Sequence, residues 1–224
     1  MIALLVVGLF AGRFALRSFL YPKPGQMPPV VAESTERLLE QLQSVLEKRA
    51  PAVLQSLQPG LSDKQIDELQ AKGGFSLSPD LRAMYRWRNG SKSDFIPGHR
   101  FLPLEDVVAE RDALASQNKA ASWGGRMFYA AFAAHREPWV HILDDGAGDG
   151  YFHDPVRGKS GEFFYNMGEA SYYVFFPSAR NFLKGVIDGY EQEIFKVKDG
   201  GKDLDEDFEQ AMKMWHRLGA ANAE

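Results

Sequence analysis

The sequence predicts an α+β fold in which an antiparallel sheet of about four to six strands is flanked by helices. Two observations indicate this class. Apolar residues recur at helical spacing near both ends of the chain, whereas residues 127–167 contain short aromatic or β-branched runs separated by Gly, Pro and Asp. Because these strand-like runs follow one another without intervening helices, a parallel α/β sheet is not expected.

Length and composition exclude several classes of protein. The chain has 224 residues, of which 45% are apolar and 12% aromatic, which suits one sizeable packed domain with appendages and is too apolar for a disordered chain. The formal net charge is −4, and no basic stripe is present, so no nucleic-acid partner is expected. The sequence contains no cysteine, which excludes disulfides, thiolate zinc sites and thiol catalysis.

Residues 1–21 are predicted to form an apolar helix outside the domain. The uncharged part ends at Gly12, which is shorter than the roughly 20 residues that a bilayer span needs, and a longer helix includes Arg13 and Arg17. A cleaved signal peptide is disfavoured because the segment lacks a basic start and a small-residue cleavage site. We expect a single-pass membrane anchor with the domain in the cytoplasm, since the positive residues follow the apolar run; a helix lying in the membrane surface is the alternative.

The next segments are predicted in order along the chain. Residues 22–33 form a proline-rich, extended linker. Residues 34–195 form the α+β domain, which begins with an amphipathic helical stripe interrupted by Pro51. The apolar positions of this stripe are Leu38, Leu39, Leu42, Val45, Leu46 and Val53.

Two further helices are predicted from their end signals. The first has Ser62 as N-cap, with Gln65 completing a capping box, and it ends at Gly73-Gly74. The second begins with Ser78 as cap and Pro79 in the first turn, and it is expected to end at a left-handed Asn89-Gly90.

The remaining elements complete the expected order. A short extended piece from His99 leads into a helix from about Leu104. Strands are expected at 127–134, 138–145, 150–155 and 161–167, followed by a helix within 177–195. Residues 196–224 are expected to form a separate C-terminal unit with an amphipathic helix. The stretch "KVKDGGKD" (196–203) separates this helix from the one before it, and the apolar face of the helix consists of Leu204, Phe208, Ala211, Trp215 and Leu218.

The stretch "DDGAGDGYFHDP", residues 144–155, is the strongest candidate for chemistry. A calcium loop fails because Ala147 and Val156 stand where oxygen ligands are needed. The "GKS" at 158–160 copies the end of a phosphate-binding loop, but His153 stands where its first glycine should be. The order of His135, Glu137 and His141 does not match a helical zinc motif. No metal or cofactor is therefore expected.

A structural interpretation of the same stretch is preferred. Two strand-like runs flank a turn of Asp and Gly, which tolerate positive φ, and Asp144 and Asp145 are able to accept hydrogen bonds from the turn's own amides. The remaining alternative is that the exposed carboxylates bind a partner. His153 and Asp154 resemble a general-base pair, but no nucleophile in a strained turn accompanies them.

Several motifs, taken in order, resemble the SUKH superfamily, which includes a fungal cell-wall assembly regulator and bacterial toxin-immunity proteins. The resemblance covers about Gln55 to Phe195, and the N-terminal segment and the Trp215 helix are additions to the family's pattern. The matching features are a helix with the pattern P-x-L…Y…N-G (Pro79, Leu81, Tyr85, Asn89, Gly90), an "LPLE" segment (Leu102 to Glu105), a Trp-led strand entering D-G-x-G-D (Trp139, Asp145, Gly146, Gly148, Asp149), and Asp154 on the following strand.

The resemblance implies a non-enzymatic protein-binding module with a SUKH-like α+β domain and no cofactor. The chain would bind a toxin as an immunity protein. Alternatively, it would act as a membrane-attached scaffold or regulator and bind a cell-envelope assembly protein. A hydrolase using His153 is the least favoured hypothesis. The candidate partner-binding residues are Asp144, Asp145, Asp149, Tyr151, His153, Asp154, Trp87, Trp123 and Glu105.

Overall fold

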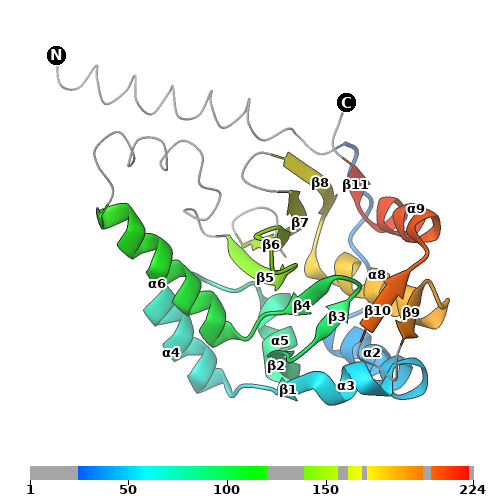
Figure 1. Cartoon of the computed structure of the whole chain (residues 1–224), viewed down its shortest axis with the longest axis horizontal. Coiled ribbons are helices and arrows are strands. Elements are labelled where there is room, and N and C mark those ends of the chain that lie inside the picture. The colour runs from blue at the N-terminus through cyan, green and yellow to red at the C-terminus, as the bar shows by residue number, and fades with distance from the viewer. Residues whose placement is uncertain (1–24, 121–138, 156–160, 168–170, 199–202, 222–224) are drawn as a thin grey trace.

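The computed structural model describes residues 25–120, 139–155, 161–167, 171–198 and 203–221. Within them a central antiparallel sheet is accompanied by helices, with α4 and α6 on one side and α2, α8 and α9 on the other (Figure 1). The α+β class is thereby confirmed. The expected anchor at 1–21, the expected strand at 127–134 and Trp123 all lie outside the described residues. Among the residues that are described, no helix is both long and apolar enough to cross a membrane.

The main sheet has the strand order β11-β8-β7-β6-β5-β4-β3, and every neighbouring pair is antiparallel. The two-residue β11 takes the sheet one strand beyond the expected range. The strands are β3 (Asp94–Ile96), β4 (His99–Phe101), β5 (Val140–Asp144), β6 (Gly150–Asp154), β7 (Glu162–Met167), β8 (Ser171–Phe176) and β11 (Ala220–Ala221).

The helices begin and end close to the signals in the sequence. Ser62 accepts a hydrogen bond from the Gln65 amide while the Gln65 side chain accepts one from Ser62, and Gly74 ends the same helix at φ 65°. The helices are α2 (Thr35–Arg49), α3 (Pro51–Ser56), α4 (Asp63–Gly73), α5 (Pro79–Trp87), α6 (Leu104–Ala120), α8 (Ala179–Glu191) and α9 (Phe208–Leu218).

The expected stop at Asn89-Gly90 is wrong in its structural type. Helix α5 already ends at Trp87, and the chain continues as strand β2 (Arg88–Ser91), which pairs with β1 (Leu57–Pro59). Gly90 does have a positive φ of 82°, but it is needed inside the strand, because a Cβ there would lie 2.5 Å from the Pro103 nitrogen.

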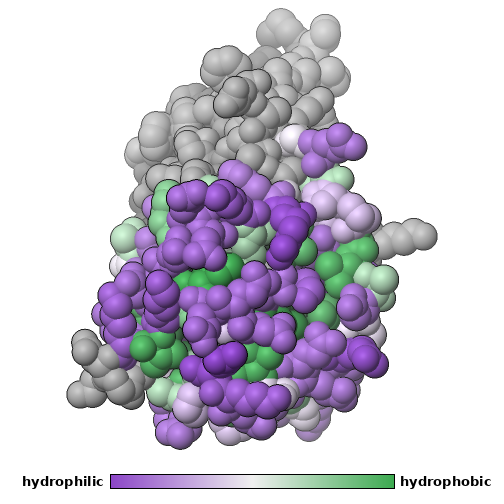
Figure 2. All heavy atoms as spheres, turned by 90° about the vertical axis from the view of Figure 1, so that its right-hand side faces the viewer, coloured by the Kyte–Doolittle hydropathy of each residue, from purple (hydrophilic) through white to green (hydrophobic). Residues whose placement is uncertain are grey.

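The C-terminal segment differs most from the expectation. The stretch expected to separate the last two helices and the expected start of the last helix instead form the hairpin β9 (Phe195–Lys198) and β10 (Asp203–Glu206), so Leu204 lies on a strand. The helix itself starts only after Asp207, whose side chain accepts from the Gln210 amide. Phe208 in its first turn is 66% exposed rather than buried. The surface on this side of the molecule is mostly hydrophilic, with separate hydrophobic patches (Figure 2).

Helix α9 packs into the hydrophobic core of the domain. The Trp215 ring lies parallel to Phe182 of α8, with ring centroids 5.8 Å apart. It also packs on Gly185, where a Cβ would lie only 2.3 Å from the indole. Trp215 therefore closes the main hydrophobic core on the α8 face of the sheet.

The sheet buries apolar side chains on both faces. Successive residues of a strand point to opposite faces, so Phe163 enters the main core while Phe164 enters a second cluster. This second cluster contains Trp139, Phe152, Phe164 and Phe175, with Met27 packed against it. A strand buried on both faces leaves mainly its ends and turns available for a partner.

Candidate functional site

The acid-and-glycine stretch is the turn between β5 and β6. Asp144 Oδ1 accepts a hydrogen bond from the Gly146 amide at 3.0 Å, and Asp145 Oδ1 accepts from the amides of Ala147 at 2.8 Å and Asp149 at 3.0 Å. Gly146 has φ 80°, a backbone conformation that L side chains rarely adopt. The predicted structural hairpin is confirmed, as are the predicted hydrogen bonds from the turn amides to the side chains of Asp144 and Asp145.

Metal binding gains no support from this turn. Two of its carboxylates are held by the turn's own amides, as described above. Among the described residues, no group of three or more His, Asp or Glu side chains is arranged to hold a metal ion.

Aromatic rings from three strands meet beside the turn. His99 on β4 lies with its ring centroid 5.3 Å from those of both Tyr151 on β6 and Tyr165 on β7, and the two tyrosine rings are 4.8 Å apart. His99 Nδ1 lies 2.9 Å from the Pro97 carbonyl oxygen, so Nδ1 carries the proton. His99 and Tyr165 remain partly exposed, whereas Tyr151 is buried beneath them.

Acidic groups surround these rings. Burial, and then the negative charges of Asp149 and Asp145, raise the pKa of Tyr165 to about 12. Burial raises the pKa of Tyr151, and the neighbouring Tyr165 and Glu206 of β10 raise it further. We call His99, Tyr165, Asp145, Asp149 and Glu206 the acidic–aromatic surface. Its one phenol, that of Tyr165, stays protonated at neutral pH, while its carboxylates make the surface attractive to cations.

Glu206 gives this surface a measurable pH dependence. Burial, and then Asp205, raise the pKa of the Glu206 carboxyl above its ordinary value. When the pH rises above the pKa that the carboxyl has in the unfolded state, the folded state binds more protons than the unfolded state. The free energy of unfolding therefore falls as the pH rises. We therefore expect Glu206→Gln to raise the free energy of unfolding at about pH 7 and to have little effect at about pH 4.

Urea unfolding at the two pH values checks this prediction. The exposed Glu33 offers a matched control, and Glu33→Gln should leave stability nearly unchanged at both pH values. An equal gain from Glu206→Gln at about pH 4 and about pH 7 would contradict the assignment.

Three of the predicted partner-binding residues are not at the surface. Tyr151 is 7% exposed, Asp154 3% and His153 0%. Asp154 Oδ2 instead accepts a hydrogen bond at 2.7 Å from Trp139 Nε1 within the sheet. In this conformation a partner therefore cannot contact them directly; Tyr151 and Asp154 support neighbouring rings.

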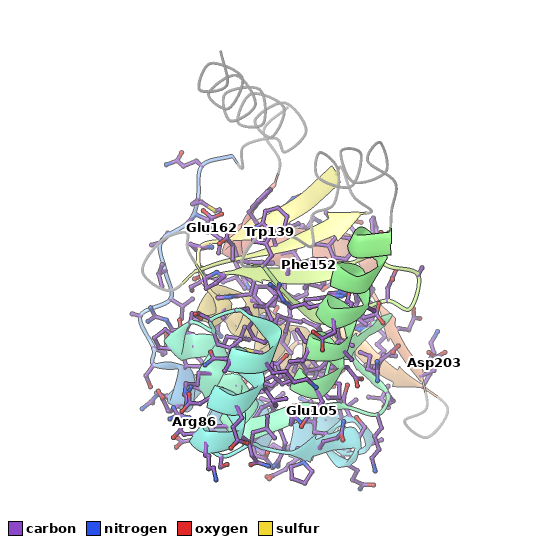
Figure 3. All side chains as sticks on the ribbon, turned by 90° about the vertical axis from the view of Figure 1, so that its left-hand side faces the viewer. Arg86, Glu105, Trp139, Phe152, Glu162 and Asp203 are labelled. Atoms are coloured by element: carbon purple, nitrogen blue, oxygen red, sulfur yellow. The ribbon has the colours of Figure 1, made fainter. Side chains whose placement is uncertain are left out.

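Glu105 belongs to a structural unit at the start of α6. Asn89 donates through Nδ2 to Glu105 Oε2 at 2.7 Å, and its Oδ1 accepts from the Leu104 amide at 2.9 Å. The "N-G" and "LPLE" motifs thus cap one helix together. In Figure 3, Glu105 lies well below Phe152, which stands between the candidates Tyr151 and His153 in β6, so these candidates do not converge on one site.

Trp87 lies apart from the turn. It is partly buried and lines a groove between α2 and α5. Of the candidates that the structure describes, only Asp145 and Asp149 therefore belong to the acidic–aromatic surface, with Asp144 next to it in the turn.

Sequence reasoning missed His99, Tyr165 and Glu206 as site residues. His99 directly follows a Pro-Gly turn, and Tyr165 alternates with Phe163 along β7, so both carried a strand signal but no functional one. Glu206 was missed because the segment from Leu204 was expected to be helical, whereas Glu206 lies on strand β10. Only tertiary folding brings the three residues together.

Comparison with known proteins gives one family. The model of the SMI1 / KNR4 family (SUKH-1) matches residues 60–185. This range covers the acid turn, His99 and Tyr165, but it ends before the β9–β10 hairpin and α9. No curated protein matches the chain.

Proposed function

Because this chain belongs to the SMI1 / KNR4 family (SUKH-1), we propose that it is a non-enzymatic protein-binding module whose acidic–aromatic surface holds the partner. The family supports a protein-interaction or immunity-type role in general terms. The observation that carries the proposal for this surface is the meeting of the His99 and Tyr165 rings, both partly exposed, with the Asp145 and Asp149 carboxylates of the β5–β6 turn.

The chemistry of the surface favours a basic partner. Partly exposed aromatic rings are typical anchors of binding energy at protein interfaces, and the acidic rim attracts positive charge during encounter. A lysine or arginine side chain placed over the ring of Tyr165 would gain a cation–π contact as well as the attraction of Asp145 and Asp149. We therefore expect a partner that presents at least one such side chain.

The hydrolase hypothesis is weakened by the position of its key residue. A general base must reach the substrate, but His153 is fully buried within β6. Its neighbour Asp154 is bonded to the Trp139 indole. These observations support the non-enzymatic proposal.

The biological role that we propose is immunity to a toxin whose surface is basic. A membrane-attached scaffold in cell-envelope assembly is the second candidate. The apolar sequence of residues 1–21 favours this role as much as it favours immunity. In both roles the N-terminal segment would tether the domain to a membrane, with the domain on the cytoplasmic side.

Neutralising the acidic rim tests the proposed surface. Asn at position 145 keeps the carbonyl oxygen that accepts from the Ala147 and Asp149 amides, and Asn at position 149 keeps the size of the side chain. Asp145→Asn with Asp149→Asn should therefore fold normally and lose only charge. Tyr165→Ala removes the ring. The tagged full-length chains are captured from native membranes in mild detergent. The amount of partner that co-purifies with each variant should be lower than with the wild type by a factor of about ten or more.

A double variant with the same change in charge serves as control. Glu47 and Glu68 are exposed on α2 and α4, and Glu47→Gln with Glu68→Gln should retain the partner fully. Retention by the Tyr165→Ala and Asp145→Asn/Asp149→Asn variants at the control level would reject this surface. A toxin as the retained protein supports immunity, whereas an envelope-assembly protein supports the scaffold role.

A further inference from the structure

A second surface of the domain combines an apolar floor with charges of opposite sign. The groove between α2 and α5 has Leu39, Ala83 and Trp87 along it. Helix α2 contributes Glu36, Glu40 and Gln43, while Arg86 and Arg88 come from the end of α5 and the start of β2. One bank is therefore acidic and the other basic.

Two of these charges lack an opposite charge of their own. Glu40 is exposed, and its carboxylate forms no hydrogen bond or ion pair with the described part of the chain. The Arg88 guanidinium lies 5.5 Å from the centre of the Trp87 ring and donates to Gln43 Oε1 at 3.2 Å, but no carboxylate of the described residues pairs with it. Its Nε is buried and has no hydrogen-bond acceptor within the same described residues.

A partly buried guanidinium without a carboxylate is unfavourable unless a partner supplies one. Arg86, in contrast, already has acidic neighbours, with Glu36 at 3.9 Å and Asp63 at 3.6 Å. The charges that remain available are thus one acid and one base, placed on opposite banks of the same apolar groove.

We propose that two copies of this chain pair through this groove about a two-fold axis. In a two-fold interface the same patch occurs on both sides, so the acidic bank of one copy meets the basic bank of the other. Glu40 of each copy then contacts Arg88 of its partner, and the two Trp87 side chains approach each other across the apolar floors. A patch of this charge pattern is complementary to itself, which a patch of one sign cannot be.

This interface is separate from the acidic–aromatic surface. Arg86 and Asp203 of the β9–β10 hairpin lie on opposite sides of the molecule in Figure 3. Pairing of two copies would leave both acidic–aromatic surfaces free, and the proposal does not depend on the proposed function.

Charge reversal in co-expressed chains tests the pairing. Two full-length chains with different tags are produced together, one is captured, and the amount of the other is measured. Wild-type chains should co-purify. When both chains carry Glu40→Arg, or both carry Arg88→Glu, recovery should fall roughly tenfold or more, because like charges then face each other.

The mixed pair is the decisive combination. A Glu40→Arg chain carries arginine at both contact positions and an Arg88→Glu chain carries glutamate at both, so these two chains should recover each other to about the wild-type level. Misfolding of either variant cannot produce this recovery. Reversal of the exposed Glu68 on α4 to Arg, which lies outside the groove, should not reduce co-purification.

Two results would overturn the proposal. Wild-type chains that do not co-purify, and that have the mass of a single copy by sedimentation in detergent, would show that no pair forms. The groove would instead be occupied by another molecule if the mixed pair failed to co-purify. The same would hold if Glu40→Arg removed a different protein, and not the second copy, from the captured material.

Discussion

Trp215→Ala should destabilise the domain by about 3–5 kcal/mol, the usual loss for a large aromatic side chain removed from a packed core. Trp215 is 6% exposed, lies parallel to the Phe182 ring and also contacts the rings of Phe176 and Phe195. Its loss would leave a cavity between α8, α9 and the sheet. Urea unfolding followed by circular dichroism measures the change.

The same helix provides the control for this prediction. Phe208 is also aromatic, but it is 66% exposed. Phe208→Ala should therefore change the free energy of unfolding by no more than about 0.5 kcal/mol. Equal effects of the two substitutions would mean that α9 is an appendage and not part of the core.

Gly185 extends the test to a pair of residues. Alanine is favoured over glycine inside a helix by about 1 kcal/mol, yet a Cβ at Gly185 would lie 2.3 Å from the Trp215 ring. We expect Gly185→Ala to destabilise the wild type by about 1–3 kcal/mol through overpacking and to stabilise the Trp215→Ala variant. An effect of the same sign in both backgrounds would contradict the contact.

Asn89→Ala should destabilise the domain by about 2 kcal/mol. The substitution removes the side chain that accepts from the Leu104 amide and donates to Glu105, so a buried backbone N–H at the start of α6 loses its acceptor. Both the lost cap and the unsatisfied N–H act in the same direction. Urea unfolding again gives the free energy.

Glu105→Gln is the matched control at this cap. Glutamine keeps an oxygen that accepts from Asn89, so its effect should stay within about 0.5 kcal/mol. If Glu105→Gln were as damaging as Asn89→Ala, the charge of Glu105 rather than the cap would stabilise this end of α6. The "N-G…LPLE" pattern therefore has a structural explanation that does not involve a partner.

Local signals predicted the parts of the fold that are decided locally. The capping box at Ser62 and Gln65, the cap at Ser78 and the turn bonds of Asp144 and Asp145 all involve residues within four positions of each other. Such contacts follow from the sequence because no distant segment is needed to form them.

Elements that depend on distant partners were predicted less well. Trp215 enters the core through Phe182, which is remote in the sequence. The β9–β10 hairpin is a local element, but it was missed because Leu204 and Phe208 continue the helical spacing of the α9 residues. Asn89-Gly90 has the composition of a helix stop, but pairing with β1 draws it into a strand.

The candidate site was found in part for the same reason. Asp145 and Asp149 stand out because they cluster in the sequence. Alternation along β6 shows that Tyr151 and His153 share a face, but it does not show that both faces of the strand are buried. His99 and Glu206 reach the turn only through the order of the strands and the position of the β9–β10 hairpin.

Site-specific photo-crosslinking at position 165 tests the central claim most directly. A photoreactive phenylalanine derivative replaces Tyr165 in the full-length chain, and the same residue replaces the exposed Glu68 in a control; both are irradiated in cells of the native host. A partner on the acidic–aromatic surface predicts one crosslinked protein from position 165 and none from position 68. The same products from both positions, or none from position 165 while the partner still co-purifies, would contradict the claim.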